Sequence, residues 1–273
     1  MRAHPEALSG RAVLVTGAAG AIGGALCHRL VQEGAAVTAL DADGAAVRVL
    51  VGRLGSSARA LEADVGDPAQ VAAAVERAAG CWGRIDAVVC AAAVVDVGRV
   101  EQRGVAGARR VLEVNLLGAW SVVCAALPYL TEARGYVLLI GSASAFLHAP
   151  GQAAYAASKA GVVALGDALR AELAPAGVAV GVAHLGRVAT PAAEAAMADP
   201  VLAALNRATR NPLVRPQSVD AAAAALVGAL RKRSRDVVAP PWLLPVVAPP
   251  LVAQRVFETL LGRASRTSFP FDR

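Results

Sequence analysis

Short apolar runs alternate with Ala-rich segments of helical length along most of the chain. Each run is bounded by Gly, Asp or charged residues, and its near-continuous hydrophobicity is what a strand covered on both faces requires. Strands that alternate with helices favour an α/β fold built on a doubly wound parallel sheet with right-handed crossovers. Strands are expected at residues 12–16, 35–40, 58–64, 85–90, 136–141 and 178–184, and helices at residues 22–33, 68–79, 104–130 and 153–174.

The composition predicts one globular domain over residues 1–273. The chain is 56% apolar and 18% charged, so it can bury a sizeable core. Its net charge of +6 is spread along the sequence, and the one basic cluster, RKRSR at 231–235, is typical of a positively charged helix end. A strand-like segment follows this cluster rather than interleaved aromatic residues, so nucleic-acid binding is not expected.

The four cysteines lie far apart, with no CxxC or Cys/His spacing, so neither a disulfide framework nor a metal site is predicted. The first ten residues are too polar for the apolar core of a signal peptide. Gly or charged residues interrupt the apolar stretches upstream of residue 236 before they reach the length of a membrane span. We therefore expect a cytoplasmic protein.

The first expected strand runs directly into the sequence TGAAGAIGG at residues 16–24. Gly17, Gly20 and Gly23 lie where the chain must turn tightly, bring backbone amides against a pyrophosphate, and let a helix pack closely on the strand. The helix N-terminus then presents its unpaired N–H groups to the phosphates. A purely structural turn is the alternative, but the position directly after the first strand favours a dinucleotide site.

Two aspartates follow at the ends of the next strands. Asp41, about twenty residues beyond the glycines, is placed to accept hydrogen bonds from both adenosine ribose hydroxyls and to repel a 2′-phosphate, which predicts NAD rather than NADP. A turn or helix-cap role is its alternative. Asp64 could accept a hydrogen bond from the adenine amino group, or could simply order the turn that contains Asp67 and Pro68.

The segment AAYAASKAGVVAL, residues 153–165, places a lysine four residues after a tyrosine on an expected helix. Tyr155 and Lys159 therefore share one helix face. A free phenol titrates near pKa ~10, so it is a poor base at neutral pH unless a nearby cation such as Lys159 stabilises the phenolate. Lys159 could also hydrogen-bond the nicotinamide ribose.

Ser142 and Asn115 complete the set of candidate catalytic residues. Ser142 follows the fifth strand, and ligands of open α/β sheets bind at the carboxyl ends of strands, so it can hydrogen-bond a substrate oxygen. Asn115 lies inside an expected helix, where Asn is a mediocre helix former and a local reason is needed; its amide could hold a water that links Lys159 to solvent. Taken singly, each residue also has an ordinary structural explanation.

Over roughly residues 8–239 the sequence resembles the short-chain dehydrogenase/reductase family. The resemblance depends on TGxxxGIG at 16–23, the acidic end of the second strand at Asp41, the Asp64-Val65 pair, Asn115, and Ser142 followed by an intact YxxxK. It implies a Rossmann-type sheet of about seven strands in three layers and the NAD(P)-dependent interconversion of an alcohol and a carbonyl. It also implies a catalytic set in which Tyr155 is the acid/base, Ser142 orients the carbonyl, Lys159 lowers the tyrosine's pKa and grips the ribose, and Asn115 completes a proton relay. The cofactor-binding set that it implies is Gly17, Gly20, Ala21, Ile22, Gly23, Asp41, Asp64, Val65, Ala91, Ala92, Tyr155, Lys159, Val188 and Thr190.

Two segments depart from the family pattern. Where the family usually has NNAG after the fourth strand, this chain reads CAAA at 90–93. The amide side chain of the first Asn is lost at Cys90, together with hydrogen bonds worth roughly 1 kcal/mol each, and the methyl group of Ala93 could crowd the ribose. The usual Pro-Gly after the sixth strand is Leu185-Gly186, although Thr190 is retained at the position that usually contacts the carboxamide.

We expect an NAD-dependent dehydrogenase that oxidises a bulky hydrophobic secondary alcohol, such as a steroid, terpenoid or long-chain alcohol, since residues 190–216 are small and mostly apolar. A catalytically silent NAD-sensing or scaffold protein is the alternative. The C-terminal extension, residues 240–273, could cover the substrate pocket, form a subunit interface or touch a membrane surface. The small-residue faces of the helices at 104–130 and 153–174 predict a homodimer or homotetramer.

Overall fold

Residues 7–199, 202–203 and 215–250 are described in the computed structural model of the chain. Within them, seven strands form one parallel sheet in the order β3-β2-β1-β4-β5-β6-β7. The predicted doubly wound α/β fold is confirmed, and the strand order reverses between β1 and β4, where such sheets bind ligands. The strands are β1 (Ala12–Thr16), β2 (Ala36–Asp41), β3 (Ala58–Glu62), β4 (Ala87–Cys90), β5 (Tyr136–Ile140), β6 (Ala179–Leu185) and β7 (Asp236–Ala239).

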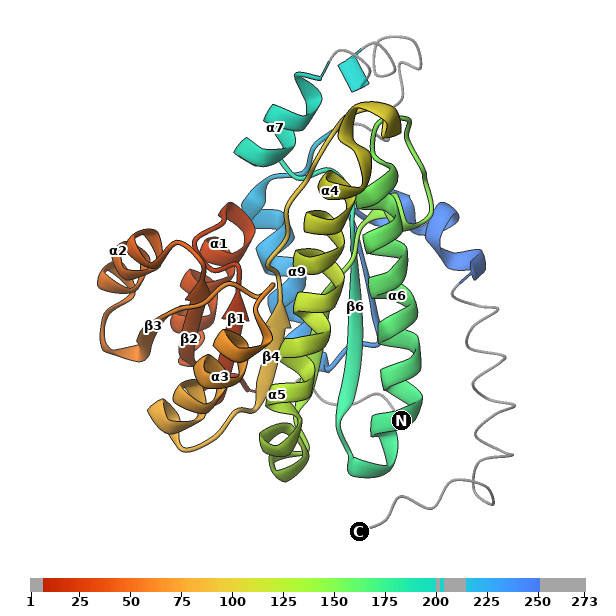
Figure 1. Cartoon of the computed structure of the whole chain (residues 1–273). Helices are drawn as coiled ribbons and strands as arrows, with labels where there is room; N and C mark the ends of the chain where they lie inside the picture. The colour runs from red at the N-terminus through yellow and green to blue at the C-terminus, as the bar shows by residue number, and fades with distance from the viewer. Residues whose placement is uncertain (1–6, 200–201, 204–214, 251–273) are drawn as a thin grey trace.

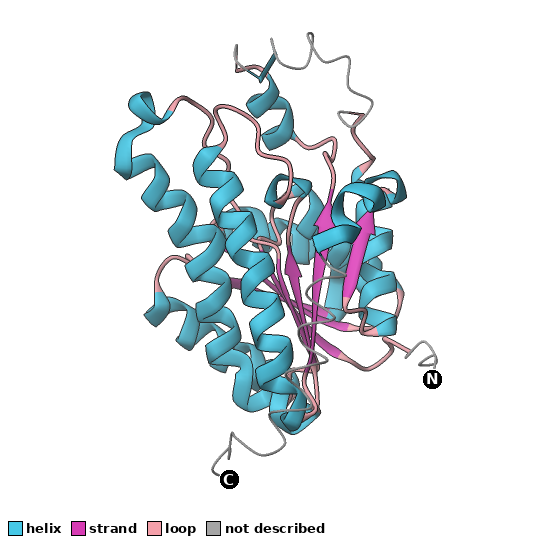
Figure 2. Ribbon diagram, turned by 90° about the vertical axis from the view of Figure 1, so that its right-hand side faces the viewer, coloured by secondary structure: helices cyan, strands magenta, loops and turns pink. Residues whose placement is uncertain are grey.

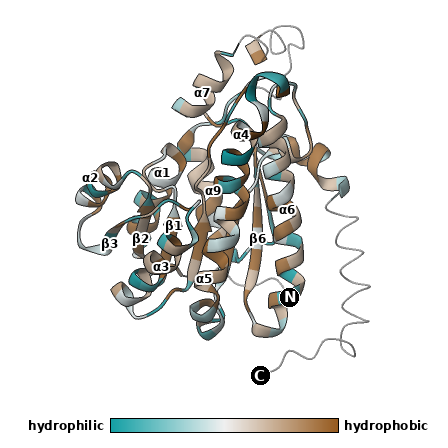
Figure 3. Ribbon diagram, viewed as in Figure 1, coloured by the Kyte–Doolittle hydropathy of each residue, from teal (hydrophilic) through white to brown (hydrophobic). Residues whose placement is uncertain are grey.

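Helices cover both faces of the sheet (Figures 1 and 2). One apolar core joins the sheet to α1, α2 and α9, and a second joins it to α3, α5 and α6. Successive side chains of a strand point to opposite faces, so Leu138 of β5 belongs to the first core and Leu139 to the second. The strands therefore carry hydrophobic residues on both faces (Figure 3). The main helices are α1 (Ala21–Gln32), α2 (Gly44–Leu54), α3 (Pro68–Trp82), α4 (Val100–Leu112), α5 (Gly118–Ala133), α6 (Ala153–Leu173), α7 (Pro191–Met197) and α9 (Val219–Lys232).

Helices α2 and α9 are absent from the elements expected from the sequence. Helix α2 contains two Gly and three Val in eleven residues, which lowers its intrinsic helix propensity. Its N-terminus is fixed instead by Asp43, whose carboxylate accepts a hydrogen bond from the N–H of Ala46 at 2.9 Å. Helix α9 begins in the same way at Ser218, whose hydroxyl oxygen accepts from the N–H of Ala221 at 3.1 Å.

The long helix expected at 104–130 is a composite. Helix α4 begins earlier, at Val100, and Gly104 interrupts it with a positive φ of 58°. A π turn, η2 (Glu113–Leu117), then joins α4 to α5. The whole run Val100–Ala133 is long and apolar enough to cross a membrane, contrary to the expectation that such stretches are too short, but 44% of its apolar window is buried inside the protein. Its contacts with α3 and α6 make it a core helix of the fold.

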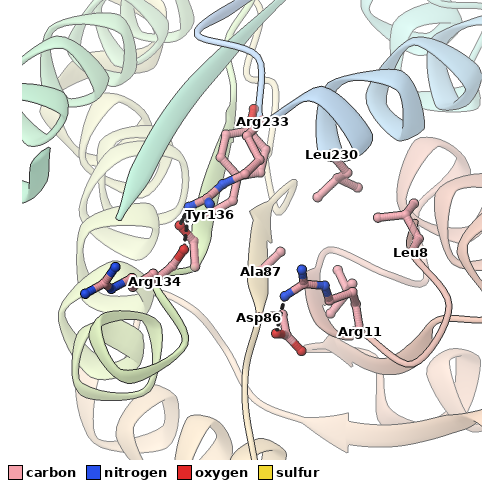
Figure 4. Close-up of a pocket in the computed structure, with 10 residues that line it drawn as sticks. Leu8, Arg11, Asp86, Ala87, Arg134, Tyr136, Leu230 and Arg233 are labelled. Atoms are coloured by element: carbon pink, nitrogen blue, oxygen red, sulfur yellow. Dashed lines mark hydrogen bonds and ion pairs between the residues drawn. The ribbon is translucent and has the colours of Figure 1, made fainter. Parts of the chain in front are cut away.

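The amino ends of the strands are closed by polar side chains that bind one another (Figure 4). Asp86, which is 5% exposed, accepts hydrogen bonds from Arg11 at 3.0 Å, from Arg84 at 2.5 Å and from the N–H of Ala12 at 2.8 Å. The Tyr136 hydroxyl donates to the carbonyl of Ser234 at 2.7 Å. The pocket drawn in Figure 4 lies among these residues, at the end of the sheet opposite to the candidate catalytic residues.

Candidate active site

The glycine loop after β1 is shaped by close backbone contacts. Gly17 has a φ of +65°, and a Cβ there would lie 2.6 Å from the Cα of Ala92. A Cβ at Gly23 would collide with the carbonyl oxygen of Gly17. Helix α1 follows with Gly20 as its N-cap and no side-chain cap. The N–H groups of its first turn, including those of Ala21 and Ile22, therefore receive no side-chain cap, so the helix N-terminus suits an anionic group.

Asp41 lies directly beside this loop. Its carboxylate accepts hydrogen bonds from the N–H of Ala19 at 2.9 Å and from the N–H of Asp43 at 3.0 Å. Each carboxylate oxygen has a second lone pair, so the group can still accept hydrogen bonds from a diol. The end of β2 thus brings a negative charge next to the glycine loop, as the NAD prediction requires.

Asp64 has the contacts of a turn residue. The strand β3 ends at Glu62, two residues before the expected end, and Asp64 lies in the loop that follows. Its carboxylate accepts from the N–H of Gly66 at 2.9 Å and pairs with Arg110 at 3.1 Å. The neighbouring Val65 is buried and would lie 2.7 Å from a Cβ at Gly118, so this loop packs tightly on the start of α5. The predicted adenine contact of Asp64 stays a prediction.

The segment after β4 is held by Thr16 rather than by an amide side chain. The Thr16 hydroxyl accepts hydrogen bonds from the N–H of Ala91 at 3.1 Å and of Ala92 at 3.2 Å. The thiol of Cys90 donates a hydrogen bond to the carbonyl of Ala119 at 3.9 Å, and burial raises the pKa of the thiol to about 12. A protonated thiol is a weak hydrogen-bond donor, so the loss of the expected Asn is compensated at Thr16 and not at Cys90.

Tyr155 and Lys159 lie on the same face of α6. The Lys159 ammonium nitrogen is 5.7 Å from the centroid of the Tyr155 ring. Lys159 is 3% exposed and donates a hydrogen bond to the carbonyl of Ile140, the last residue of β5, at 2.8 Å. Burial lowers the pKa of Lys159 to about 8. The lysine therefore brings a buried, titratable cation to the end of the strand that leads into Ser142.

Ser142 begins the short helix η3 (Ala143–Ala145), and its hydroxyl oxygen accepts from the N–H of Ser144 at 3.1 Å. Burial raises the pKa of Tyr155, and a hydrogen bond with Ser142 opposes this rise. The pKa of Tyr155 is therefore raised overall, whereas the sequence predicted that Lys159 would lower it. The Ser142 hydroxyl is the neighbour that opposes the rise in the pKa of Tyr155.

Asn115 occupies the π turn between α4 and α5, which explains an Asn inside an apparently continuous helix. Its side-chain oxygen accepts from the N–H of Val94 at 2.8 Å, and its amide nitrogen donates to the Val94 carbonyl at 3.0 Å and to the Ser158 hydroxyl at 3.1 Å. Ser158 in turn donates to the carbonyl of Tyr155 at 2.7 Å. The amide therefore joins the segment after β4 to α6, and its predicted part in a water relay stays a prediction.

Val188 and Thr190 lie in the segment that follows β6. Val188 is 5% exposed and forms a backbone bridge with Gln217. The Thr190 hydroxyl oxygen accepts from the N–H of Ala193 at 3.1 Å and thereby caps α7. Both residues lie between the carboxyl end of β6 and the start of α7, and the carboxamide contact predicted for Thr190 stays a prediction.

The residues present fit a dinucleotide. The glycine loop leaves no room for a Cβ where backbone amides would meet phosphate, and Asp41 lies beside this loop. Tyr155 and Lys159 lie together near the carboxyl end of β5. Arranged in this way, the site can bind an NAD-like molecule along the strand ends and place its reactive ring near Ser142 and Tyr155.

Sequence reasoning missed three residues that hold this arrangement together. Ser158 is completely buried between Asn115 and the Tyr155 carbonyl, and its position next to Lys159 in YAASK was the only local signal. Thr16 was noted as part of the glycine motif but not as the support for residues 91–92. Leu243 is 1% exposed and packs near Ser142 from the far end of the chain, which no local pattern could indicate.

Comparison with other proteins gives matches that cover most of this core. A family model described as short chain dehydrogenase matches residues 11–200. The chain is 33% identical over 169 residues to D-threitol dehydrogenase of Mycolicibacterium smegmatis, covering 60% of this chain and 65% of that protein. It is 34% identical over 191 residues to an uncharacterized NAD-dependent oxidoreductase of Mycobacterium tuberculosis, covering 63% of this chain and 70% of that protein.

Among solved structures, the fold is similar to that of 3-ketoacyl-(acyl-carrier-protein) reductase from Brucella melitensis, which was crystallised with NADH. The TM-score is 0.76 at 26% sequence identity, and the match covers 85% of this chain and 98% of the reductase. By contrast, the chain spans less than two thirds of the length of D-threitol dehydrogenase. The residues that the family model matches include the glycine loop and α6.

Proposed function

The chain belongs to the short-chain dehydrogenase family, and from this premise we propose that it is an NAD-dependent oxidoreductase that interconverts a secondary alcohol and a ketone. The observation that carries the proposal is the meeting of three groups at the carboxyl end of β5. Lys159 lies 5.7 Å from the Tyr155 ring and donates to the carbonyl of Ile140, two residues before Ser142, and the Ser142 hydroxyl opposes the rise that burial causes in the pKa of Tyr155. A phenol, a hydroxyl and an ammonium group in this order can bind and deprotonate an alcohol.

Tyr155 is proposed to carry the proton. In alcohol oxidation its phenolate accepts the proton of the substrate hydroxyl, and in ketone reduction its phenol returns that proton to the carbonyl oxygen. Bound NAD supplies the acceptor for the hydride that leaves the carbinol carbon. The Ser142 hydroxyl oxygen accepts from the N–H of Ser144, and its single hydrogen can be donated to the Tyr155 oxygen in the free chain or to the substrate oxygen when substrate is bound, which would hold that oxygen beside the phenol.

Lys159 and Asn115 are proposed to support this step. The Lys159 ammonium group has donors beyond the one given to Ile140, and these can bind a ribose hydroxyl. Asn115 joins α6 to the segment after β4 through hydrogen bonds to Ser158 and Val94. These bonds are proposed to fix the position of Tyr155 relative to the glycine loop. We expect alcohol oxidation to be the physiological direction, because NAD is the proposed cofactor.

The proposed choice of NAD over NADP depends on Asp41. A carboxylate beside Ala19 would repel the 2′-phosphate of NADP and accept hydrogen bonds from the ribose of NAD. The two neighbouring positions, Ala19 and Ala42, offer no positive charge to a phosphate. An NADP preference in steady-state kinetics would contradict this assignment.

We propose a hydrophobic substrate of the steroid, terpenoid or long-chain type. The support is the apolar character of the segments around Ser142: Phe146 and Leu147 follow it, and α7 has the sequence PAAEAAM. D-threitol dehydrogenase, by its name, acts on a small polyol, so polyols form the natural contrasting class of test compounds.

The test is NADH absorbance with matched panels of hydrophobic secondary alcohols and of polyols. Steady NADH formation with the hydrophobic panel supports the proposal, whereas turnover of polyols alone would overturn the substrate class. Binding of NADH without turnover of any compound would favour the alternative, a catalytically silent NAD-sensing or scaffold protein on the same fold. The presence of both Tyr155 and Lys159 speaks against that alternative, because a silent protein needs neither.

We also propose that the enzyme works as a cytoplasmic homo-oligomer. Leu117 and Trp120, at the start of α5, are 54% and 53% exposed, and apolar side chains at this level of exposure favour burial against a second copy. The four cysteines are free in the described residues, which suits a reducing compartment. Light scattering that gives a monomer mass would overturn the oligomer. Residues 251–273 of the C-terminal extension lie outside the described residues. Pocket cover, subunit contact and membrane contact therefore stay alternative predictions for the extension.

A further inference from the structure

The chain continues after β7 into a segment that returns to the candidate active site. This C-terminal segment, residues 240–250, begins with the short helix η6 (Pro241–Leu243) and lies beyond the part of the chain that the family model matches. Leu243 and Val247 are 1% and 0% exposed and form a small apolar cluster of their own. These two side chains of the C-terminal segment are therefore as buried as those of the central strands.

One side of this cluster contacts the loop that carries Ser142. Ala143 and Phe146, which begin η3 and follow it, pack against Leu243 and Val247. The Phe146 ring also packs against His184 of β6, with ring centroids 5.4 Å apart and planes tilted by 57°. The loop that follows Ser142 thus packs against both β6 and the C-terminal segment.

The other side contacts the segment after β6 that carries Val188 and Thr190. A Cβ at Gly186 would lie 2.8 Å from the Cδ1 of Leu243, so the leucine rests directly on the glycine backbone. The N–H of Gly186 donates to the carbonyl of Ala239 at 2.7 Å, and the Gln217 amide donates to the same carbonyl at 2.9 Å. Hydrogen bonds therefore join the segment after β6 to the end of β7 beneath Leu243.

We propose that Leu243 is a positioning residue that sets the spacing between the Ser142 loop and the segment 186–190. The inference rests on the proposed function, in which the first loop holds the substrate oxygen and the second contacts the carboxamide of NAD. Because only 1% of its surface is exposed, Leu243 is not expected to contact either ligand. It acts by filling the space between the two backbones, and a change of about 1 Å in such spacing can lower turnover by roughly 10²-fold.

The experiment compares Leu243→Ala with Leu130→Ala. Leu130 is also completely buried, but it lies near the end of α5 beside Gly135, at the amino end of the sheet. Both variants remove the same atoms from a core, so a comparable fall in melting temperature is expected. Amide hydrogen exchange of residues 142–147 and 186–189 is followed in both, together with kcat and KM for NAD.

We expect Leu243→Ala to speed exchange in both segments and to lower kcat at least about tenfold. KM for NAD should change less than kcat, because Gly17 and Asp41, which are proposed to bind the pyrophosphate and the adenosine ribose, are not part of the altered contact. Leu243→Met, which restores most of the volume, should recover kcat, and Leu130→Ala should leave both segments and kcat close to wild type. If Leu243→Ala does not fold, the milder pair Leu243→Val and Leu130→Val gives the same comparison.

Unchanged exchange in either segment, or a kcat no lower than that of Leu130→Ala, would overturn the inference while leaving the proposed function intact. Failure of the proposed function gives a different result. A wild-type protein that binds NADH but turns over no compound would overturn the proposed function, and faster exchange in Leu243→Ala would then assign the leucine a structural role only.

Discussion

Tyr136 and Tyr155 sit at opposite ends of the same sheet and show what separates a structural tyrosine from a candidate catalytic one. Tyr136 begins β5, is 2% exposed, and donates its hydroxyl proton to the Ser234 carbonyl at 2.7 Å. Tyr155 lies beyond the other end of β5 on α6, half-buried, with Ser142 and Lys159 as its polar neighbours. Burial raises the pKa of both phenols.

The difference lies in what surrounds each hydroxyl. The Ser234 carbonyl can only accept a hydrogen bond, so it favours the neutral phenol of Tyr136, which keeps its hydrogen to donate. Ser142 can donate or accept, and Lys159 can donate, so the surroundings of Tyr155 can stabilise both phenol and phenolate. Burial alone therefore does not identify a catalytic tyrosine; the proton-donating capacity of its neighbours does.

The largest effect should come from Tyr155→Phe. Removal of the hydroxyl takes away the proton carrier but not the apolar ring, so NADH binding, followed by fluorescence, should stay close to wild type. Turnover should fall by roughly 10²- to 10⁴-fold, the usual range for a positioned acid or base. Turnover that survives the substitution would remove Tyr155 from the mechanism.

The second effect concerns pH and Lys159. Its pKa is about 8 in the folded chain against an ordinary 10.5, because burial disfavours the charged form. Between pH 8 and pH 10.5 the unfolded state binds more protons than the folded state. The cost of burying the charged Lys159, which lowers the free energy of unfolding, therefore diminishes as the pH rises through this range. The full difference corresponds to roughly 3 kcal/mol as an upper bound at 1.36 kcal/mol per pKa unit.

Urea unfolding of wild type and Lys159→Met between pH 7 and pH 10 measures this effect. The stability of wild type relative to Lys159→Met should rise with pH over this range. A constant difference would show that the ammonium group keeps an ordinary pKa. The same variant should lose turnover at every pH, because the cation beside Tyr155 is gone.

The third effect separates two neighbouring aspartates. Asp41→Ala removes the carboxylate beside the glycine loop, and a charged hydrogen bond of this kind contributes about 1.5–3 kcal/mol, so kcat/KM for NAD should fall roughly tenfold or more. The preference for NAD over NADP should narrow at the same time, since the repulsion of a 2′-phosphate is lost. Asp43→Ala is the matched control, because Asp43 caps α2 and should affect stability rather than cofactor choice.

Local spacing predicted the parts of the site that lie close together in the sequence. The interval of four residues on one helix brings Lys159 within 5.7 Å of the Tyr155 ring, and a glycine loop directly after a strand has the expected tight turns. The alternation of apolar runs likewise predicted the parallel sheet. These features depend on helix and strand periodicity, which the sequence expresses directly.

Contacts between distant segments could not be predicted in this way. The amide of Asn115 is bound by Val94 and Ser158, 21 and 43 residues away, and the π turn that orients it has no local signature. Leu243 reaches the Ser142 loop only because β7 lies beside β6. The upward shift in the pKa of Tyr155 also depends on burial, which is a property of the assembled fold.

The smallest effect on activity should come from Tyr136→Phe, which repeats the chemical change of Tyr155→Phe at the other end of the sheet. The hydroxyl packs tightly, since a Cβ at Gly181 would collide with it, and its loss leaves the Ser234 carbonyl without this donor. An unfolding free energy lower by about 1–3 kcal/mol is expected, with kcat within about twofold of wild type. An equally strong fall in kcat for Tyr136→Phe and Tyr155→Phe, at equal stability of the two variants, would contradict the distinction between a structural and a catalytic tyrosine. A phenol that only donates to a carbonyl would then affect the chemical step.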